Sequence, residues 1–169
     1  MHYNEKGDAM NKIYSRDKLR EEINRLRKEG KKIVFTNGCF DILHVGHTRY
    51  LKEAKKRGEV LILGLNSDES VRSLKGETRP LIPESERADV VAALESVDYV
   101  TIFHETTPLE LIEYLRPDIL VKGGDWKEEQ VVGRQSVEKW GGSVIIIPEI
   151  IGSSTTNIIE KIKKVYGIQ

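Results

Sequence analysis

Hydrophobic residues along the chain are gathered in short, nearly unbroken runs. Five such runs predict β-strands, at residues 33–35, 60–65, 99–103, 119–121 and 144–147. Segments with helical spacing lie between these runs and after the last of them, near residues 47–57, 85–96, 108–115, 128–140 and 155–166. Apolar strands that alternate with helices are typical of a parallel sheet covered on both faces. We therefore expect an α/β fold with a Rossmann-like five-stranded parallel sheet, helices on both faces and right-handed crossovers.

One further helix is predicted ahead of the first strand. Leu19, Ile23 and Leu26 share one helical face in "SRDKLREEINRLRKEG", where Ser15 can cap the start and Gly30 can end the helix. The chain is thereby divided into an N-terminal extension with a helix, residues 1–30, and a main domain, residues 31–169.

Composition excludes several classes of protein. Lysine plus arginine number 27 and aspartate plus glutamate number 27, so the formal net charge is zero and no general basic field would collect nucleic acid. The single cysteine, Cys39, cannot form an intramolecular disulfide and fits a reducing cytoplasm. The first residues are polar, unlike a signal peptide, and the apolar runs are too short to span a membrane. We expect a cytoplasmic protein that binds neither membrane nor nucleic acid.

Three polar, glycine-bearing segments follow predicted strands. "TNGCFDILHVGH" follows the first strand, "KGGDW" the fourth and "PEIIGSSTTN" the fifth. In open α/β sheets, ligands bind beyond the carboxyl ends of the strands, where the strand order reverses. These three segments should therefore converge on one binding site.

His44 and His47 allow three interpretations. They could be packed or surface residues, and they could bind a metal together with Cys39, although the chain has no second Cys/His cluster to complete a structural zinc site. The third interpretation is phosphate binding: Gly46 permits close approach of a ligand, and a helix beginning near His47 would direct its positive end there.

The whole segment is more specific than its histidines. It resembles the nucleotidyltransferase superfamily, which has a G-x-F-D turn and an H-x-G-H motif after its first strand. The matching residues are Gly38, Phe40, Asp41, His44, Gly46 and His47. That superfamily also carries an S-T-T segment before its last helix, which Ser154, Thr155 and Thr156 match. These residues could equally be plain helix caps, and both roles use the same end of a helix.

The middle of the chain resembles the bacterial adenylyltransferases that activate heptose 1-phosphate. The resemblance rests on "LKGETRPLIPESERADVVAALESVDYV" and "ELIEYLRPDILVKGGDW" and covers about residues 30 to 166. It implies transfer of AMP from ATP to a heptose 1-phosphate, giving ADP-heptose for lipopolysaccharide or surface glycan. It also implies the stand-alone form of the enzyme, a separate sugar kinase upstream and a homodimer.

A cytidylyltransferase acting on glycerol 3-phosphate or a related alcohol phosphate is the alternative. Those enzymes typically have an arginine three positions before the glycine of the final motif and a lysine just after its threonines. Here Glu149 and Asn157 occupy those places, which weakens the cytidylyl alternative. A nucleotide-binding regulatory module without turnover is a rival from another class.

The resemblance implies roles for individual residues. His44, His47 and Lys75 would be catalytic. The residues expected to bind the nucleotide are Asn37, Gly38, Cys39, Phe40, Gly46, Lys122, Gly123, Asp125, Ser154, Thr155 and Thr156. Those expected to bind the sugar phosphate are Asp41, Arg79, Arg87, Gly124 and Trp126. Mg²⁺ is expected with ATP, held by nucleotide oxygens and water, with no protein side chain as a ligand.

Plainer roles stay open for several of these residues. Lys75 and Arg79 could belong to an ordinary solvated loop, and Arg87 could pair with a neighbouring glutamate on the surface. Cys39 could be a small packing group rather than a redox or nucleophilic one, and Trp126 could cover the sheet edge rather than stack on a ligand.

Overall fold

The computed structural model describes residues 12–124, 127–148 and 154–167 of the chain. Its strands are β1 (Ile33–Gly38), β2 (Val60–Asn66), β3 (Tyr99–Phe103), β4 (Ile119–Gly123) and β5 (Ser143–Ile147). Its α-helices are α1 (Arg16–Lys28), α2 (Val45–Lys55), α3 (Asp68–Lys75), α4 (Glu84–Ala92), α5 (Leu109–Leu115), α6 (Arg134–Lys139) and α7 (Thr155–Tyr166). A 3₁₀ turn, η1 (Glu128–Gln130), precedes α6.

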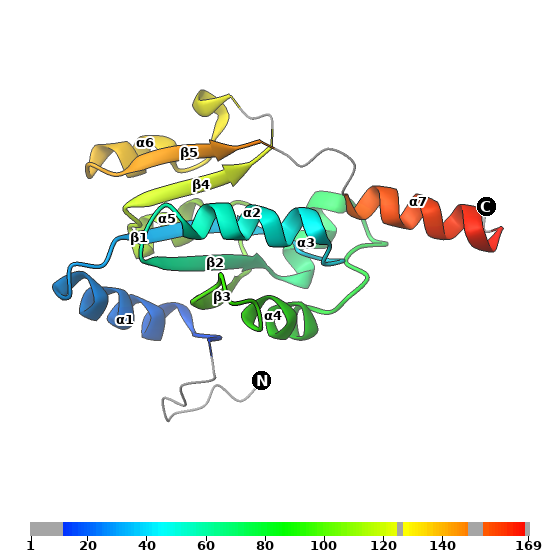
Figure 1. Cartoon of the computed structure of the whole chain (residues 1–169), viewed down its shortest axis with the longest axis horizontal. Helices are drawn as coiled ribbons and strands as arrows, with labels where there is room; N and C mark the ends of the chain where they lie inside the picture. Colours follow the sequence, from blue (N-terminus) through cyan, green and yellow to red (C-terminus); the bar gives the residue numbers. More distant parts are fainter. Residues whose placement is uncertain (1–11, 125–126, 149–153, 168–169) are drawn as a thin grey trace.

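The five strands form one parallel sheet in the order β3-β2-β1-β4-β5 (Figure 1). The chain runs outward from β1 to β3, then crosses back to place β4 on the other side of β1. The strand order therefore reverses between β1 and β4, which is where such sheets bind ligands. The predicted α/β fold with a five-stranded parallel sheet is confirmed.

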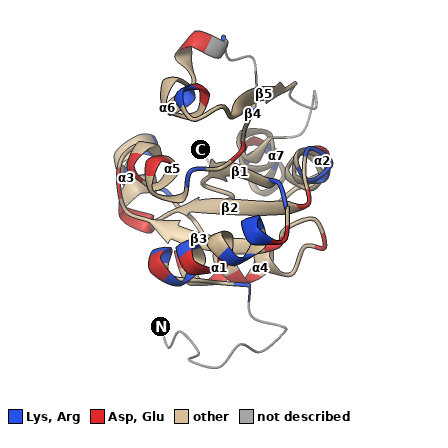
Figure 2. Ribbon diagram, turned by 90° about the vertical axis from the view of Figure 1, so that its left-hand side faces the viewer, with Lys and Arg blue, Asp and Glu red and all other residues tan. Residues whose placement is uncertain are grey.

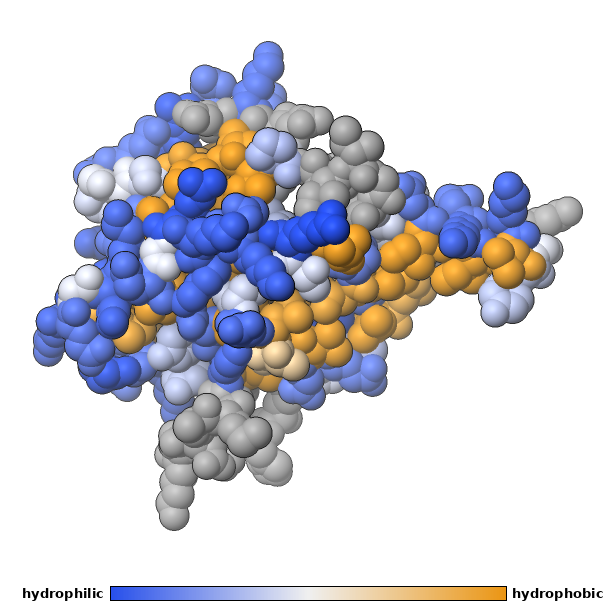
Figure 3. All heavy atoms as spheres, viewed as in Figure 1, coloured by the Kyte–Doolittle hydropathy of each residue, from blue (hydrophilic) through white to orange (hydrophobic). Residues whose placement is uncertain are grey.

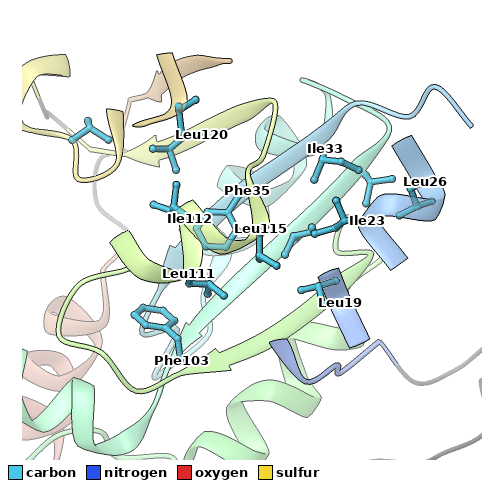
Figure 4. Close-up of a cluster of buried hydrophobic side chains, with 14 residues drawn as sticks. Leu19, Ile23, Leu26, Ile33, Phe35, Phe103, Leu111, Ile112, Leu115 and Leu120 are labelled. Carbon is cyan, nitrogen blue, oxygen red and sulfur yellow. The ribbon is translucent and has the colours of Figure 1, made fainter. Parts of the chain in front are cut away.

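Both faces of the sheet are buried. Ile33 and Phe35 of β1 belong to a cluster completed by α1, α5 and α6, which Figure 4 shows for α1 and α5. Val34, between them, points to the opposite face and packs in a second cluster with α2 and α4. Because side chains alternate along a strand, a strand buried on both faces is apolar at nearly every position, and buried polar residues such as Thr36 are exceptions.

The N-terminal helix is part of this core. Leu19 and Ile23 of α1 have no exposed surface, and Leu26 is 6% exposed. The segment just before α1 lies along the outer strand: Tyr14 N donates to Val100 O at 2.9 Å, and Val100 N donates to Lys12 O at 2.8 Å. It thereby covers part of the free edge of β3.

Helix α3 was not predicted. A polar loop is expected at residues 73–80, whereas residues 68–75 form a helix capped by Ser67, whose side chain accepts the Ser70 N–H. The helix is amphipathic but short, and only Ser70 and Val71 are buried. Lys75 therefore ends a helix, and the loop begins after it.

Other boundaries also differ from the prediction. The expected helix at 128–140 is broken by Gly133, whose φ of 88° is left-handed, so that only a 3₁₀ turn and the short α6 form. The helix expected at 85–96 ends at Ala92. Helix α2 begins two residues earlier than expected because His44 caps it.

Charge is spread over the helices with both signs interleaved. Figure 2 shows blue and red segments along the helices, while the strands are mostly tan. None of the described helices is long and apolar enough to cross a bilayer.

Candidate active site

A pocket of about 510 Å³ opens at the reversal of strand order. The ends of β1, β4 and β5 form its floor, and α2 and the first turn of α7 line it. Most of the predicted site residues meet here. They are Asn37, Gly38, Cys39, Phe40, His44, Gly46, His47, Lys75, Lys122, Gly123, Ser154, Thr155 and Thr156.

His44 is the N-cap of α2. Its Nδ1 accepts the Gly46 N–H at 3.1 Å. A neutral imidazole that accepts at Nδ1 carries its proton on Nε2, so His44 is left with a single donor that can reach a ligand. Burial lowers the pKa of His44, which favours this neutral form.

His47 lies between two other rings. It stacks on His44, with centroids 3.8 Å apart and planes at 26°, and its other neighbour is the Phe40 ring at 5.0 Å. Its Nδ1 is buried and has no hydrogen-bond partner among the described residues, which leaves Nε2 for a ligand. Burial, with a smaller contribution from His44, lowers the pKa of His47 to about 4.

A second helix begins at the same pocket. Ser154 caps α7 by accepting the Asn157 N–H at 3.1 Å, and Thr155 Oγ1 lies 3.5 Å from Ile42 O, beside the entry to α2. The first-turn N–H groups of α2 and α7 thus face one space. Two helix N-termini pointing at one pocket make it attractive to anions.

Three cationic side chains add to this field. Lys122 Nζ donates to Asn37 Oδ1 at 2.8 Å, and burial lowers the pKa of Lys122. Lys75 and Arg49 line the pocket and make no hydrogen bond or ion pair within the described ranges. Cys39 is also in the lining, and burial raises the pKa of its thiol, so it remains protonated at neutral pH.

Sequence reasoning missed one wall of the pocket. Arg49, Tyr50 and Glu53 line it from the flank of α2. They lie three, four and seven positions after Gly46, which is the spacing of one helical face, so this signal was present in the sequence.

Gly123 has a reason other than ligand approach. A Cβ built on it would lie 2.9 Å from the Tyr50 ring, closer than real contacts allow. The Tyr50 hydroxyl is 2.6 Å from Thr36 Oγ1 and donates to Val121 O at 3.3 Å. The glycine therefore lets α2 pack against the end of β4.

Four residues expected to bind the sugar phosphate are not in the lining of this pocket. Asp41, Arg79 and Arg87 are not among the residues that line the pocket; their polar atoms bond to the protein itself. Gly124 is buried at the end of β4, where its N–H donates to Ile147 O at 3.0 Å. Asp125 and Trp126 fall outside the described residues.

Comparison with known proteins gives the same assignment as the motifs. The cytidylyltransferase-like family matches residues 35–161. The bifunctional protein HldE of Geobacter metallireducens is 59% identical over 95% of this chain and 33% of its own length. That of Syntrophotalea carbinolica is 58% identical over 92% of this chain and 32% of its own. The chain therefore spans about a third of the length of these curated relatives.

A solved structure shares the fold. The lipopolysaccharide core biosynthesis protein from Thermoplasma volcanium is 31% identical, with a TM-score of 0.60, over 72% of this chain and 98% of its own. The family match covers most of the chain and includes all the pocket residues named above, from β1 to the start of α7. The chain belongs to the cytidylyltransferase-like family.

Proposed function

We propose that this protein transfers AMP from ATP to a heptose 1-phosphate, giving ADP-heptose and pyrophosphate. The observation that carries the proposal is the stacked pair His44–His47, which lies where the N-termini of α2 and α7 face one pocket. The choice of sugar rests on the HldE relatives, and the printed name of the solved neighbour, a lipopolysaccharide core biosynthesis protein, agrees with it. The reaction would take place in the cytoplasm, after a sugar kinase activity has made the 1-phosphate.

The chemistry requires alignment more than proton transfer. A phosphate oxygen of the sugar phosphate attacks the α-phosphorus of ATP in line, a new P–O bond forms, and the bond to pyrophosphate breaks. The attacking oxygen is already anionic, so no general base is needed, and catalysis rests on position and charge stabilisation.

Each group has a place in this scheme. The Nε2 atoms of His44 and His47 donate to the α-phosphate and to the bridging oxygen as charge develops. Lys75 contacts the triphosphate from the end of α3, and Ser154 and Thr155 hold the β- and γ-phosphates at the start of α7.

Mg²⁺ belongs to the proposal as the companion of ATP, whose charge it neutralises. No cluster of three or more His, Cys, Asp or Glu side chains that could hold a metal is found in the described part of the chain. Among the described residues, a single carboxylate lines the pocket, that of Glu53, and it pairs with Lys56. This donor set fits an ion held by triphosphate oxygens and water, with at most one protein ligand.

A substrate panel tests the proposal. ATP and CTP are each paired with heptose 1-phosphate and with glycerol 3-phosphate, and pyrophosphate release is followed. The expected result is release only with ATP and heptose 1-phosphate. Release only with CTP and glycerol 3-phosphate would establish the cytidylyl alternative, and ATP binding without release in any pair would point to a regulatory module.

Nucleotide binding should take up protons. The free histidines are neutral because their pKa values are lowered, to about 4 for His47. A triphosphate beside them favours the charged form and raises both pKa values. At a pH between the free and the bound pKa, the complex therefore holds more protons than the free protein. ATP affinity should therefore rise as the pH falls through this window.

Calorimetric titration with a non-hydrolysable ATP analogue, at about pH 6 in buffers of different ionisation enthalpy, measures the uptake. The terminal phosphate of the nucleotide titrates in the same range, so the His47→Gln variant serves as the control. Equal uptake by the variant and the wild type would contradict a role for His47.

A homodimer is also part of this proposal, and α7 supports it. None of the side chains of α7 is buried, and its apolar stripe includes Ile162, Val165 and Tyr166, which are 44%, 66% and 74% exposed. In Figure 3 the hydrophobic surface of this projecting helix continues onto the body of the protein. Monomers rarely leave such a surface uncovered.

The charged residues beside this apolar stripe favour a second copy of the chain as the partner that covers it. Lys161 and Lys164 lie on the polar side of α7, and Glu86 and Asp89 lie on the outer side of α4. All four are exposed and make no ion pair within the described residues. The α7 of one copy can therefore meet α4 of another with opposite charges facing each other.

Sedimentation velocity tests the dimer. The double variant Ile162→Glu with Val165→Glu should be monomeric at concentrations where the wild type is a dimer, because it charges the apolar stripe. The single variant Asn157→Asp, on the first turn of α7, should remain a dimer. A wild type that sediments as a monomer at all concentrations would contradict the proposal.

A further inference from the structure

The carboxylate of Asp41 is buried and fully occupied by protein partners. Its side chain is 1% exposed and accepts the Arg79 Nε–H at 2.5 Å. It also accepts the backbone N–H groups of Leu81 and Ile82, each at 2.9 Å. Burial alone would raise the pKa of Asp41, but these hydrogen bonds and Arg79 outweigh it and lower the pKa, so the group is ionised.

Arg87 binds the same segment from the other side. Its Nε donates to Ile82 O at 2.9 Å, so the residue that gives its N–H to Asp41 gives its carbonyl to Arg87. The Arg87 side chain has no exposed surface, and its other donors reach Cys39 O at 2.5 Å, Asn66 O at 2.9 Å and Asp68 Oδ1 at 2.7 Å. The two buried charges thus fasten residues 79–82 to the turn that follows β1.

Between the two fastened positions lies a strained residue. Phe40 follows Cys39, which Arg87 holds, and precedes Asp41, and its φ is 45°. A bulky side chain rarely adopts this left-handed conformation unless its surroundings impose it. The Phe40 ring is thereby directed against the His47 ring, which in turn stacks on His44. Gly38 leaves room for it, because a Cβ there would lie 2.8 Å from the Phe40 ring.

We infer that Asp41, Arg79 and Arg87 are positioning residues, which impose the left-handed turn at Phe40 and through its ring hold His47 in place for reaction. They act on the imidazole through Cys39 O and the backbone of Asp41, without touching the substrate. This explains why these three charged residues, although expected to bind the sugar phosphate, do not line the pocket. The kinetic consequence rests on the proposed nucleotidyl transfer, but the effect on His47 does not.

Arg79 is the member best suited to a test. Its side chain is 19% exposed, so its replacement leaves the sheet and its clusters intact. Arg79→Gln removes the charge and weakens the hold on Asp41, while Arg79→Lys keeps the charge on a single nitrogen without the planar guanidinium. Arg57→Gln, an exposed arginine at the end of α2 with no ion pair in the described ranges, is the matched control.

Two measurements decide the matter. Arg79→Gln should lower kcat about 10- to 100-fold, with the KM values for both substrates changed little, because a displaced catalytic group costs rate rather than binding. In the free protein, the pKa of His47 followed by NMR should rise from about 4 toward 6.5, because the ring becomes exposed. Arg79→Lys should give intermediate values, and Arg57→Gln should match the wild type.

Several results would overturn the inference. An unchanged kcat with an unchanged His47 pKa would show that the turn does not depend on Arg79. A raised KM for the sugar phosphate at constant kcat would mean that Arg79 contacts the substrate directly. If the wild type releases no pyrophosphate with any substrate pair, the proposed function fails, and the NMR measurement still decides whether the turn holds His47.

Discussion

Replacing His47 with alanine should slow formation of the nucleotide sugar by about 10² to 10³-fold in a single turnover, equivalent to roughly 3–4 kcal/mol of transition-state stabilisation. His47 presents Nε2 to the pocket, while its Nδ1 is buried and its ring is fixed between Phe40 and His44. A donor fixed in this way needs no reorganisation when charge develops on the α-phosphate. The loss should fall on kcat, because the interaction strengthens only in the transition state.

Single-turnover measurement after rapid mixing, with thermal denaturation of each variant alongside, isolates the chemical step. His104→Ala is the matched control, because His104 is exposed and lies outside the pocket lining. His47→Gln keeps an amide donor and should recover part of the rate. A folded His47→Ala protein with a near-normal rate would remove His47 from the mechanism.

Replacing Arg87 with methionine should lower the free energy of unfolding by about 3–5 kcal/mol, because it removes a fully buried cation from its ion pair with Asp68 and from three carbonyl acceptors. Methionine fills much of the same space, so the loss is mainly electrostatic. Asp68 loses its cationic partner, and the carbonyls of Cys39, Asn66 and Ile82 lose their donors. Buried acceptors left without partners add to the cost.

Urea denaturation at neutral pH gives the measurement. Arg57→Met changes an exposed arginine at the end of α2 and should alter stability by less than about 0.5 kcal/mol. A loss of under about 1 kcal/mol for Arg87→Met would mean that the carbonyls find other partners, and the role of Arg87 in the turn at Phe40 would then be wrong.

The strands were predictable because both faces of the sheet are buried. Continuous apolar runs such as that of β2 predict strands of a parallel sheet that is covered by helices on both faces. All seven residues of β2 are in fact buried. Helix α3 was not predicted because an amphipathic pattern over only eight residues, with two buried positions, is too short to be recognised as a helix. Its signal was local: a serine cap at Ser67 followed by Asp68 and Glu69, the acidic first turn of many helices.

The candidate site was predictable where backbone chemistry is distinctive. The first three residues of the G-x-F-D turn, the two histidines and the S-T-T segment all reach the pocket, because each segment follows a strand that ends at the same edge. Charged residues were harder to place. A sequence shows that Asp41, Arg79 and Arg87 carry charge, but only packing decides whether a charge meets a ligand or another buried group. Arg49, Tyr50 and Glu53 were not predicted, although they follow Gly46 at the spacing of one helical face.

The N-terminal helix lies outside the family match but inside the hydrophobic core. The family match begins at Phe35, after α1 and the first residues of β1. Yet α1 places Leu19, Ile23 and Leu26 in the same cluster as Phe35 and Leu115 (Figure 4). A fragment that began at Phe35 would lose the three side chains of α1 and leave part of one face of the sheet open to water. The family match is therefore smaller than the folding unit, whereas the alignment with the Geobacter metallireducens relative covers 95% of this chain and extends through α1.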